Sequence, residues 1–426
     1  MDEHINPGDR FMVKKSILVV LLIFLITGCS NPTIEPVYTL TPTRVVKTTT
    51  IPTSTSTPTP TGTSTPTKTR TPTKRPTATP TSIYPSEGFG PDEFPVDVNP
   101  LTGLHVEDAA VLERRPIAIK VNIVPRYNRP PWGLSLADIV YEYYHNSGYT
   151  RFHAIYYSND AEMVGPIRSG RFPDDELIKI YKSIFVYGSA DPIINSRFFW
   201  AEYYDRLVLE RGQTIQCPPE PTNPFCRYDP NGYNFLLSGT SEVHTFVADR
   251  NFANIRQDLT GMFFQDTPPE GGKVGEEVTT IYSLDTYNKW VYDLTIGKYL
   301  RFQDNLYLDQ GQDEEFVPLN DRLTEVQISA NNVVILLVPH IYFRKPPNEI
   351  IDIEFSDSGP AYLFRDGLMY KVVWNRPPAN GVLYLTDEEG TPFPFKHGNT
   401  WFQVIGDSSE SSQEDGTSWR FEQRFP

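Results

Sequence analysis

A segment rich in threonine and proline most limits what this chain can fold into. It follows residue 29 and contains the stretch PTSTSTPTPTGTSTPTKTRTPTKRPTATPTS. Its side chains include so few apolar groups that burial cannot offset the conformational entropy lost on folding. Alternating Thr and Pro favour extended, polyproline-like backbone, and roughly fifty residues at about 3.1 Å each reach on the order of 150 Å. We therefore predict a disordered linker over residues 30–90, with the folded part of the chain after it.

The N-terminus has a pattern typical of export. Lys14 and Lys15 precede an apolar run over residues 17–26. This run is too short to cross a bilayer, which needs about twenty residues. The run ends in LITGC, and its last residues resemble the bacterial lipobox, in which the cysteine is lipidated and becomes the mature N-terminus. We predict a signal peptide over residues 1–29 and lipidation of Cys29. The protein would then be anchored in the lipid bilayer, on the extracytoplasmic face of a bacterial cell membrane.

The charge balance disfavours one class of partner. The chain has 38 basic and 53 acidic residues, a net charge of −15. A nucleic acid would be repelled by such a surface, so we expect no nucleic-acid partner. The 24 Tyr and 25 Phe suggest β-rich structure, because aromatic side chains fit the pleated surface of a sheet.

Residues 94–265 alternate between strand and helix patterns. RPIAIKVNIV (Arg115–Val124) is typical of a strand buried on both faces, and LADIVYEYYH and TRFHAIYYS flank the turn signal NSGY. Helical spacing follows in FPDDELIKIYKSI and DPIINSRFFWAEYY. It returns in SEVHTFVADRNFANIRQDL (Ser241–Leu259), with Ser241 as candidate N-cap. This alternation predicts a mixed-sheet α/β domain.

Residues 276–406 are β-rich. Apolar and aromatic runs such as NNVVILLVPHIYF, AYLFRDGLMYKVVWN and TWFQVIG are separated by turn signals at hairpin distances. We predict an antiparallel β domain here and a polar tail over residues 407–426. The fold class is therefore α+β.

Two cysteines lie in the folded part of the chain, at the ends of the proline-rich run CPPEPTNPFC. In an exported protein, two lone cysteines this close are expected to pair, so we predict a disulfide between Cys217 and Cys226. The alternative is a metal site, but no further His, Cys or carboxylate cluster accompanies them. We predict no metal site and no cofactor, and the chain has no phosphate-binding P-loop and no GxGxxG motif.

Several blocks resemble the YerB-like bacterial lipoproteins, a family of unassigned function. They include NPLTGL, RRPIAIKVN, GLSLADIVYE, YTRFHAIYYS and GPIRSGR, and later NNVVILLVPH and GNTWFQVI. The resemblance runs from about residue 99 to residue 405 and implies a two-domain lipoprotein, but no reaction. One departure is YGSAD, where relatives usually carry a glycine-rich GGS run.

The block GPIRSGR, over residues 165–171, is the strongest candidate site. Arg168 and Arg171, with the Ser169 hydroxyl and backbone N–H groups, could form a fork for a carboxylate or phosphate. The helix that begins next would add N–H donors and a favourable dipole. The alternative is that these arginines pair with Asp174, Asp175 or Glu142 and stabilise the fold.

The loop YGSAD contributes two more candidate ligand-binding residues, Ser189 and Asp191. It follows a predicted strand and opens a predicted helix, and such a loop lies at the ligand-facing edge of a sheet. The chain lacks a GxSxG motif, so a serine nucleophile is not predicted.

Two acidic residues of the first hairpin are weaker, catalytic candidates. Asp138 and Glu142 would share one strand face, but they lie about 13 Å apart at about 3.3 Å per residue. Carboxyl pairs that cleave glycosides sit within about 10 Å, so each would need another partner. A salt bridge from Glu142 to Arg151 is the alternative role.

Histidines and aromatic residues offer alternatives as well. His145 and His153 flank the hairpin and could begin a metal site, although no third ligand is visible. In the β domain, the side chains of Trp374, Trp401 and Phe402, together with Tyr384, either stack on sugar rings or fill the core, and we favour the core.

Three functions remain open from the sequence. The first is a surface lipoprotein that binds an anionic cell-envelope ligand, such as a wall peptide or phosphodiester polymer, through the Arg168/Arg171 loop. The second is an envelope hydrolase or transferase that acts on a wall glycan or phosphodiester and uses Asp138 or Glu142 with those arginines. The third is a structural partner in a protein complex, which would present an exposed apolar patch.

Overall fold

A computed structural model describes residues 88–425 of the protein, except 213, 230–234, 251, 309–311 and 378–380. The predicted signal peptide, Cys29 and the predicted linker up to residue 87 lie outside the described residues. The described residues fall in one unit, Thr77–Pro426. No helix among them is long and apolar enough to cross a membrane.

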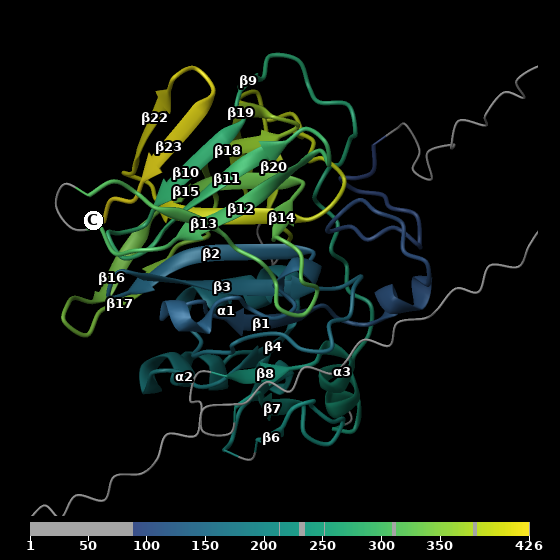
Figure 1. Ribbon diagram of the computed structural model, residues 1–426. Helices are drawn as coiled ribbons and strands as arrows, with labels where there is room; N and C mark the ends of the chain where they lie inside the picture. The colour runs from purple at the N-terminus through teal and green to yellow at the C-terminus, as the bar shows by residue number, and fades with distance from the viewer. Residues whose placement is uncertain are drawn as a thin grey trace, which may run out of the picture. The chain divides into compact units, whose positions relative to one another are not determined.

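An 11-stranded mixed sheet forms the centre of the fold (Figure 1). Its path runs in spatial order through β20 (Tyr384–Thr386), β19 (Leu368–Asn375), β18 (Ser358–Arg365), β15 (Asn332–Val338), β21 (Thr400–Gly406), β2 (Ile139–Asn146), β3 (Tyr149–Tyr156), β1 (Ile117–Val121), β4 (Ile184–Tyr187) and β5 (Leu207–Leu209), and β9 (Lys273–Val274) pairs with β19. Strand β1 is buried along its whole length, including Lys120, and burial on both faces was predicted for this segment.

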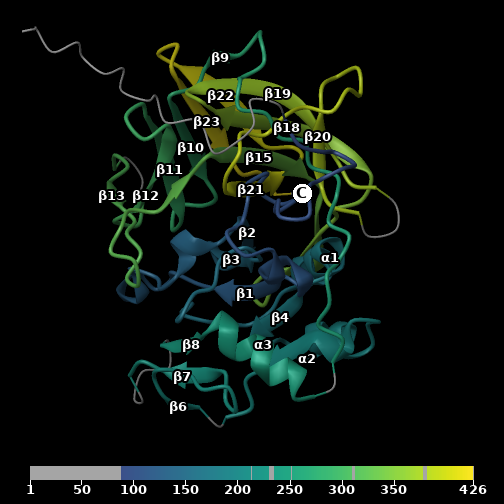
Figure 2. The same cartoon turned by 90° about the vertical axis from the view of Figure 1, so that its right-hand side faces the viewer.

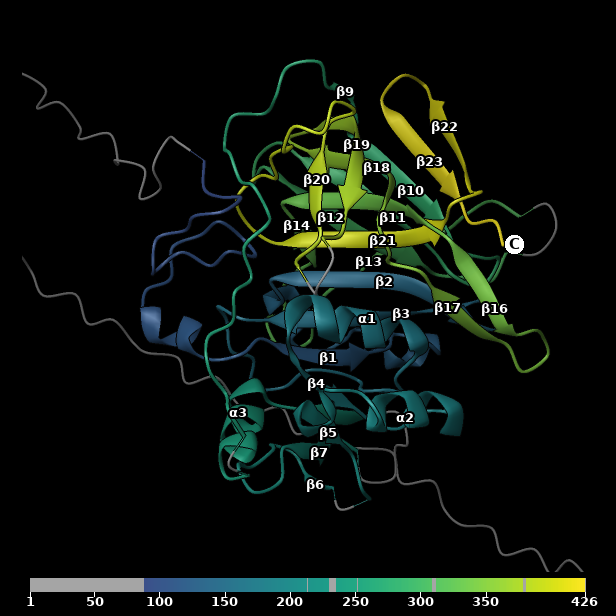
Figure 3. The same cartoon turned by 180° about the vertical axis from the view of Figure 1, so that it is seen from behind.

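Both predicted domains contribute strands to this sheet. Strand β2, from the N-terminal region, pairs in parallel with β21, from the C-terminal region, and Ile139 lies opposite Thr400 (Figure 3). Strand β21 also pairs in parallel with β15, so the C-terminal region is not purely antiparallel as predicted. Backbone hydrogen bonds therefore join the two regions.

A second, seven-stranded sheet covers one face of the first. Its path runs through β13 (Phe316–Pro318), β12 (Lys298–Asp304), β11 (Tyr287–Asp293), β10 (Glu277–Ile281), β23 (Ser418–Glu422) and β22 (Glu410–Glu414), and β14 (Ser329–Ala330) pairs with β12. The Trp290 ring on β11 packs against the Trp401 ring on β21, with centroids 5.0 Å apart. Smaller sheets are formed by β16 (His340–Arg344) with β17 (Ile350–Ile353), and by β6 (Ile215–Gln216), β7 (Phe225–Arg227) and β8 (Leu236–Ser238).

Three α-helices occur in the described residues: α1 (Phe172–Tyr181), α2 (Pro192–Phe199) and α3 (Thr240–Ala248) (Figure 2). Helix α1 packs on the face of the large sheet opposite the second sheet. On β2, the Tyr143 hydroxyl donates to Asp174 of α1, whereas the neighbouring Glu142 pairs with Arg301 of β12. Successive residues of a strand point to opposite faces of the sheet, as Glu142 and Tyr143 do here. The predicted α+β fold class is confirmed.

Two sequence predictions need correction. The helix predicted over Ser241–Leu259 ends at Ala248 and begins at Thr240, with Gly239 rather than Ser241 as N-cap. Beyond it, Asn254 accepts a hydrogen bond from the Arg115 N–H (2.8 Å) and donates to His244 (2.9 Å), and such side-chain bonds compete with helix continuation.

The second correction concerns residues 407–426, predicted to be a polar tail. They include the hairpin β22–β23, and β23 pairs in parallel with β10. Trp419 and Phe421 point inward from β23 and are buried. The segment is polar overall, so the alternation of buried and exposed residues in this short strand was not recognised from the sequence. Trp374, Trp401 and Phe402 are buried too, so the core interpretation is confirmed for these three, whereas Tyr384 is half-buried.

The hairpin β22–β23 can be tested by shortening one buried side chain. Phe421 is fully buried and packs against Tyr362, with ring centroids 4.9 Å apart. We expect Phe421→Ala to lower the free energy of unfolding, measured by urea denaturation, by about 3–5 kcal/mol because it leaves a cavity. The matched control Ser412→Ala, at an exposed position of β22, should change it by less than about 0.5 kcal/mol. Equal, small effects of both substitutions would contradict the assignment of this hairpin to the folded core.

Candidate functional site

The loop over residues 165–171 lies between β1 and the segment that follows β4, held by main-chain hydrogen bonds. The Arg168 N–H donates to Lys120 O (2.9 Å), and the Gly170 N–H donates to Ser189 O (2.8 Å). Gly165 has φ +154°, and a Cβ atom there would lie 2.7 Å from the carbonyl oxygen of Leu236. A side chain is therefore not tolerated at this position, and the backbone fixes the course of the arginine loop.

Three arginines converge beside this loop. Arg151 of β3 donates from Nη1 to Ser169 O (2.7 Å), and Arg171, at the N-cap of α1, donates from Nη1 to Gly170 O (2.9 Å). Burial lowers the pKa of the Arg151 guanidinium well below its usual range, and the charges of Arg171 and Arg168 lower it further. Burial also lowers the pKa of Arg171. The side chains of Arg151 and Arg171 are half-buried, so the cluster holds like charges close together with limited access to water.

The carboxylates near the loop do not neutralise two of these arginines. Within the described ranges, neither Arg151 nor Arg171 forms an ion pair with a carboxylate. Asp174 accepts a hydrogen bond from the backbone N–H of Arg171 (2.7 Å) and not from its guanidinium. Asp175 pairs with Lys179, and Glu142 pairs with Arg301. The structural pairing considered for Arg171 is therefore not observed.

Two adjoining hollows, each of about 400 Å³, open at the cluster. We call the first the arginine hollow; its lining includes Asn122, His145, Asn146, Ser147, Arg151 and Arg168. We call the second the serine hollow; its lining includes Asn146, Ser147, Ser169, Arg171, Ser189 and Asp191 from the N-terminal region. The β16–β17 hairpin adds Arg344, Asn348 and Glu349 to the serine hollow. Asn146 and Ser147 border both.

All five predicted ligand-binding residues line these two hollows. Arg168 lines the arginine hollow, and Ser169, Arg171, Ser189 and Asp191 line the serine hollow. The Ser169 and Ser189 hydroxyl oxygens lie 2.8 Å apart. Asp191 caps α2, pairs with Arg344 (3.0 Å) and has a lowered pKa, chiefly because its carboxylate accepts the N–H of Ile193.

A buried polar network supports the cluster from beneath. The side chains of Lys120, His153 and Asp174 are fully buried. Asp174 Oδ1 accepts hydrogen bonds from Lys120 Nζ (3.1 Å), the Tyr143 hydroxyl (2.5 Å) and His153 Nδ1 (2.8 Å). Burial by itself would raise the pKa of Asp174, but the Lys120 charge and the His153 hydrogen bond outweigh it and lower that pKa. Asp174 therefore stays ionised and fixes the first turn of α1.

The network has one group that titrates near neutral pH. Burial lowers the pKa of Lys120 to about 7, against the opposing attraction of Asp174, and Arg151 and Arg171 contribute to the lowering. Burial also lowers the pKa of His153, and it lowers that of His145 well below its usual range. The charge beneath the arginines therefore depends on the protonation of Lys120.

The two predicted catalytic carboxylates lie elsewhere. Asp138 accepts hydrogen bonds from the N–H groups of Tyr157 (2.6 Å) and Ser158 (3.0 Å) and from the Ser158 hydroxyl (2.5 Å). It borders a separate hollow of about 550 Å³. Glu142 is fully buried and pairs with Arg301 (2.8 Å), not with Arg151 as considered. Neither residue lines the arginine or serine hollow.

The two histidines are not arranged as a metal pair. His153 lies opposite Tyr141 in the hairpin and bonds to Asp174, whereas His145 Nδ1 lies 3.4 Å from Arg171 Nε. No cluster of three potential metal ligands occurs in the part of the chain that the structure describes. Cys217 and Cys226 are joined by a disulfide bond.

Lys120 and Glu349 were not identified from the sequence as part of the site. Arg151 was considered only as a partner of Glu142 and not as a member of the arginine cluster. A lysine within the apolar strand RPIAIKVNIV is a recognisable signal, because lysine is almost never buried without a partner. Glu349 carried no such signal, because it reaches the site from the distant β16–β17 hairpin.

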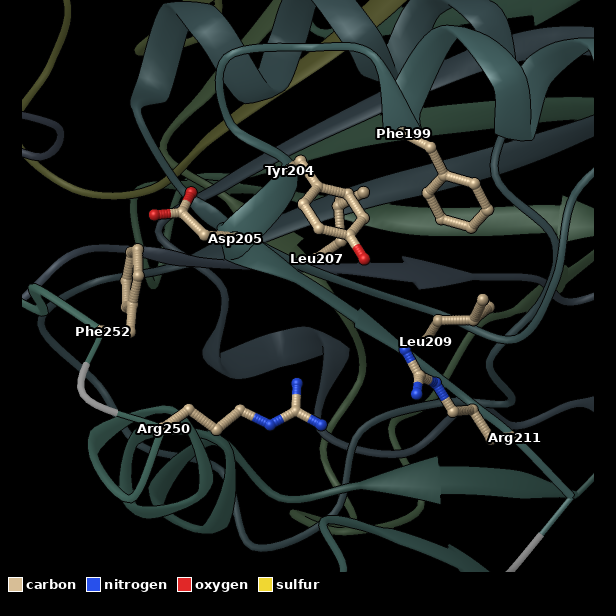
Figure 4. Close-up of a pocket in the computed structure, with 8 residues that line it drawn as sticks. All are labelled: Phe199, Tyr204, Asp205, Leu207, Leu209, Arg211, Arg250 and Phe252. Atoms are coloured by element: carbon tan, nitrogen blue, oxygen red, sulfur yellow. The ribbon is translucent and has the colours of Figure 1, made fainter.

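A different hollow, of about 280 Å³, lies beside β5 (Figure 4). The rings of Phe199, Tyr204 and Phe252 and the guanidinium groups of Arg211 and Arg250 surround it. These two arginines are exposed, so water screens their charges, in contrast to the half-buried Arg151 and Arg171. The arginine cluster is therefore the stronger candidate site.

Comparison with known proteins places the chain in a family. Residues 101–215 match the N-terminal domain, and residues 278–402 the C-terminal domain, of the family described as "Protein of unknown function (DUF3048)". A Bacillus subtilis (strain 168) protein named "Putative lipoprotein YerB" is 28% identical over 324 residues, covering 74% of this chain and 88% of the relative. The crystal structure of YerB from Bacillus subtilis superimposes with a TM-score of 0.59 at 25% identity, covering 72% of this chain and 96% of that one. The resemblance seen in the sequence is thereby confirmed, and the chain belongs to the two-domain YerB-like lipoprotein family, whose function is unassigned.

Proposed function

We propose that this lipoprotein is anchored on the extracytoplasmic face of the cell membrane and binds an anionic group of the cell envelope at the arginine cluster. The group would be a carboxylate of a wall peptide or a phosphate of a phosphodiester polymer. The proposed lipid anchor at Cys29 and the linker after it would give the folded part the reach to contact such polymers.

One observation carries the proposal. Arg151 and Arg171 border open hollows, are half-buried, and form no ion pair with a carboxylate among the described residues. A desolvated charge without a counter-ion is costly, and an anion that enters the hollow removes that cost. Guanidinium groups also match the geometry of carboxylates and phosphates through paired N–H donors.

The surroundings add to this preference. The chain as a whole carries a net charge of −15, so a local cluster of cations is not a consequence of composition. Lys120 lies beneath the cluster and adds positive charge when protonated. The carboxylates considered for catalysis are saturated by other partners, so we favour binding over hydrolysis.

Removal of either guanidinium should weaken anion binding. We expect Arg151→Ala and Arg171→Ala each to reduce the affinity for sulfate by about 10- to 100-fold, since a hydrogen bond to a charged group contributes about 1.5–3 kcal/mol. Isothermal titration calorimetry would measure this change, and retention on purified wall polymers should fall in parallel.

A matched control is Arg424→Ala, because Arg424 is exposed and pairs with the exposed Glu410. This variant should bind like the unaltered protein. Thermal unfolding of each variant establishes that it is folded. Unchanged sulfate affinity in both folded cluster variants would exclude the proposed site.

Anion affinity should depend on pH through Lys120. Its pKa of about 7 means that it loses its charge as the pH rises through neutrality, whereas the lowered pKa values of His145 and His153 keep these groups neutral there. We expect the affinity for sulfate, whose own charge is constant, to fall by up to about tenfold between pH 6 and pH 8. Titrations in buffers of different ionisation enthalpy should reveal proton uptake on binding, and a flat pH profile would contradict this role of Lys120.

The anchor is tested separately. Cells grown with labelled palmitate should incorporate label into the unaltered protein but not into Cys29→Ser, because lipidation requires the thiol. The variant Thr33→Ala, four residues further on, should keep the label. Label on the Cys29→Ser variant would refute the anchor.

A further inference from the structure

We propose that the ligand of the arginine cluster is a sugar that carries a phosphate ester, with the phosphate in the arginine hollow and the sugar in the serine hollow. This inference rests on the proposed function, because it requires the arginines to bind an anion. It adds a second subsite and the chemical class of the group that occupies it.

The two hollows differ in charge. The arginine hollow is bordered by Arg151 and Arg168 and, among the residues that the structure describes, by no carboxylate. The serine hollow is bordered by two guanidinium groups, Arg171 and Arg344, and by two carboxylates, Asp191 and Glu349, so its lining carries no net charge. Arg171 also lies beside the arginine hollow, because its Nε is 3.4 Å from Nδ1 of His145, which lines that hollow. A second anion would gain little there. The pair of hollows thus fits a ligand with one charged end and one neutral end.

The neutral end must be polar and rich in hydroxyl groups. The serine hollow presents the hydroxyls of Ser147, Ser169 and Ser189 beside the amides of Asn146 and Asn348. Hydroxyls both donate and accept, amides do the same through separate atoms, and carboxylates only accept. A sugar hydroxyl also donates and accepts, so a ring with several of them can use this mixture, whereas an apolar group would leave it unsatisfied.

Glu349 supplies an acceptor already aimed at this hollow. Its side chain is buried, and Oε1 accepts a hydrogen bond from the Tyr144 hydroxyl (2.7 Å) and another from the Ser147 N–H. Oε2 accepts no hydrogen bond from any residue that the structure describes. Glu349 lines the serine hollow, so a ligand hydroxyl that enters the hollow can donate to this oxygen.

The surrounding elements hold this subsite in place. Glu349 and Asn348 come from the β16–β17 hairpin, which the ion pairs Arg344–Asp191 (3.0 Å) and Arg197–Asp352 (2.7 Å) attach to helix α2. The serine hollow therefore combines residues of both family domains. Its volume of about 400 Å³ lies within the range of about 300–1,000 Å³ common for small-molecule sites.

The two hollows adjoin, and we place one ligand across both. Asn146 and Ser147 line each of them, at the turn between β2 and β3. A phosphate bound by Arg151 can thus be bonded directly to a sugar that lies against Ser189 and Glu349. A longer spacer between charge and sugar is not required.

Calorimetric titration of the full-length protein with small esters tests the inference. The probes are inorganic phosphate, methyl phosphate, glucose 1-phosphate, N-acetylglucosamine 1-phosphate and glucuronate. We expect at least one sugar phosphate to bind ten or more times as tightly as methyl phosphate, which has the same charge and no sugar. We expect glucuronate, an anionic sugar without phosphate, to bind more weakly than that ester.

Two variants locate the sugar. Glu349→Gln keeps the size of the side chain, and Ser189→Ala removes one hydroxyl. Each should reduce the advantage of the sugar phosphate over methyl phosphate by at least threefold. Because Glu349→Gln removes a negative charge near Arg171 and Arg344, methyl phosphate itself should bind this variant no more weakly than the unaltered protein. Glu354→Gln, at an exposed position close in sequence, is the matched control and should preserve the advantage.

The outcomes separate this inference from the proposed function. Equal affinities for the sugar phosphates and methyl phosphate would overturn the sugar subsite and leave anion binding intact. The same conclusion would follow if the sugar phosphate still bound more tightly than methyl phosphate in both variants. Tighter binding of glucuronate would overturn the assignment of phosphate. No binding of any anion would refute the proposed function itself.

Discussion

The ion pair between Glu142 and Arg301 is the contact on which the rest of the fold depends. Both side chains are fully buried, and the pair joins β2 of the large sheet to β12 of the second sheet. Removal of one partner from a buried pair leaves an uncompensated charge and typically costs about 3–5 kcal/mol. On one side of β2 this pair holds the second sheet in place. On the other side Tyr143 reaches Asp174 and the start of α1. The two faces of one strand thus connect the core to the candidate site.

That connection explains why the site lies where it does. Asp174 accepts hydrogen bonds from side chains of β1, β2 and β3 and fixes the N-terminus of α1, where the arginine loop ends at Arg171. The arginines are therefore placed by a rigid, buried network rather than by the loop alone. The β16–β17 hairpin completes the serine hollow from the other family domain. Residues of both family domains therefore line this hollow.

Much of this arrangement was predictable from local patterns. The strand and hairpin of residues 115–158, helix α1 and the burial of Trp401 follow from periodicity and turn signals, and the arginine loop was recognisable from its residue types. What sequence could not supply were pairings between distant segments. Arg301 as the partner of Glu142, and Glu349 as a neighbour of Ser147, depend on tertiary contacts that no local pattern encodes. The polar composition of residues 407–426 hid two buried aromatic side chains, because a strand of five residues needs only two inward positions.

The parallel pairing of β2 with β21 also bears on how the chain is made. Strand β2 has one neighbour, β3, close in sequence, and the other, β21, near the end of the chain. Contacts between such distant segments slow folding, because a long loop must close before they form. The partner edge of β2 cannot be covered until residues 400–406 are in place. An uncovered strand edge can pair with other chains, so partly folded forms of this protein are exposed to aggregation until β21 docks.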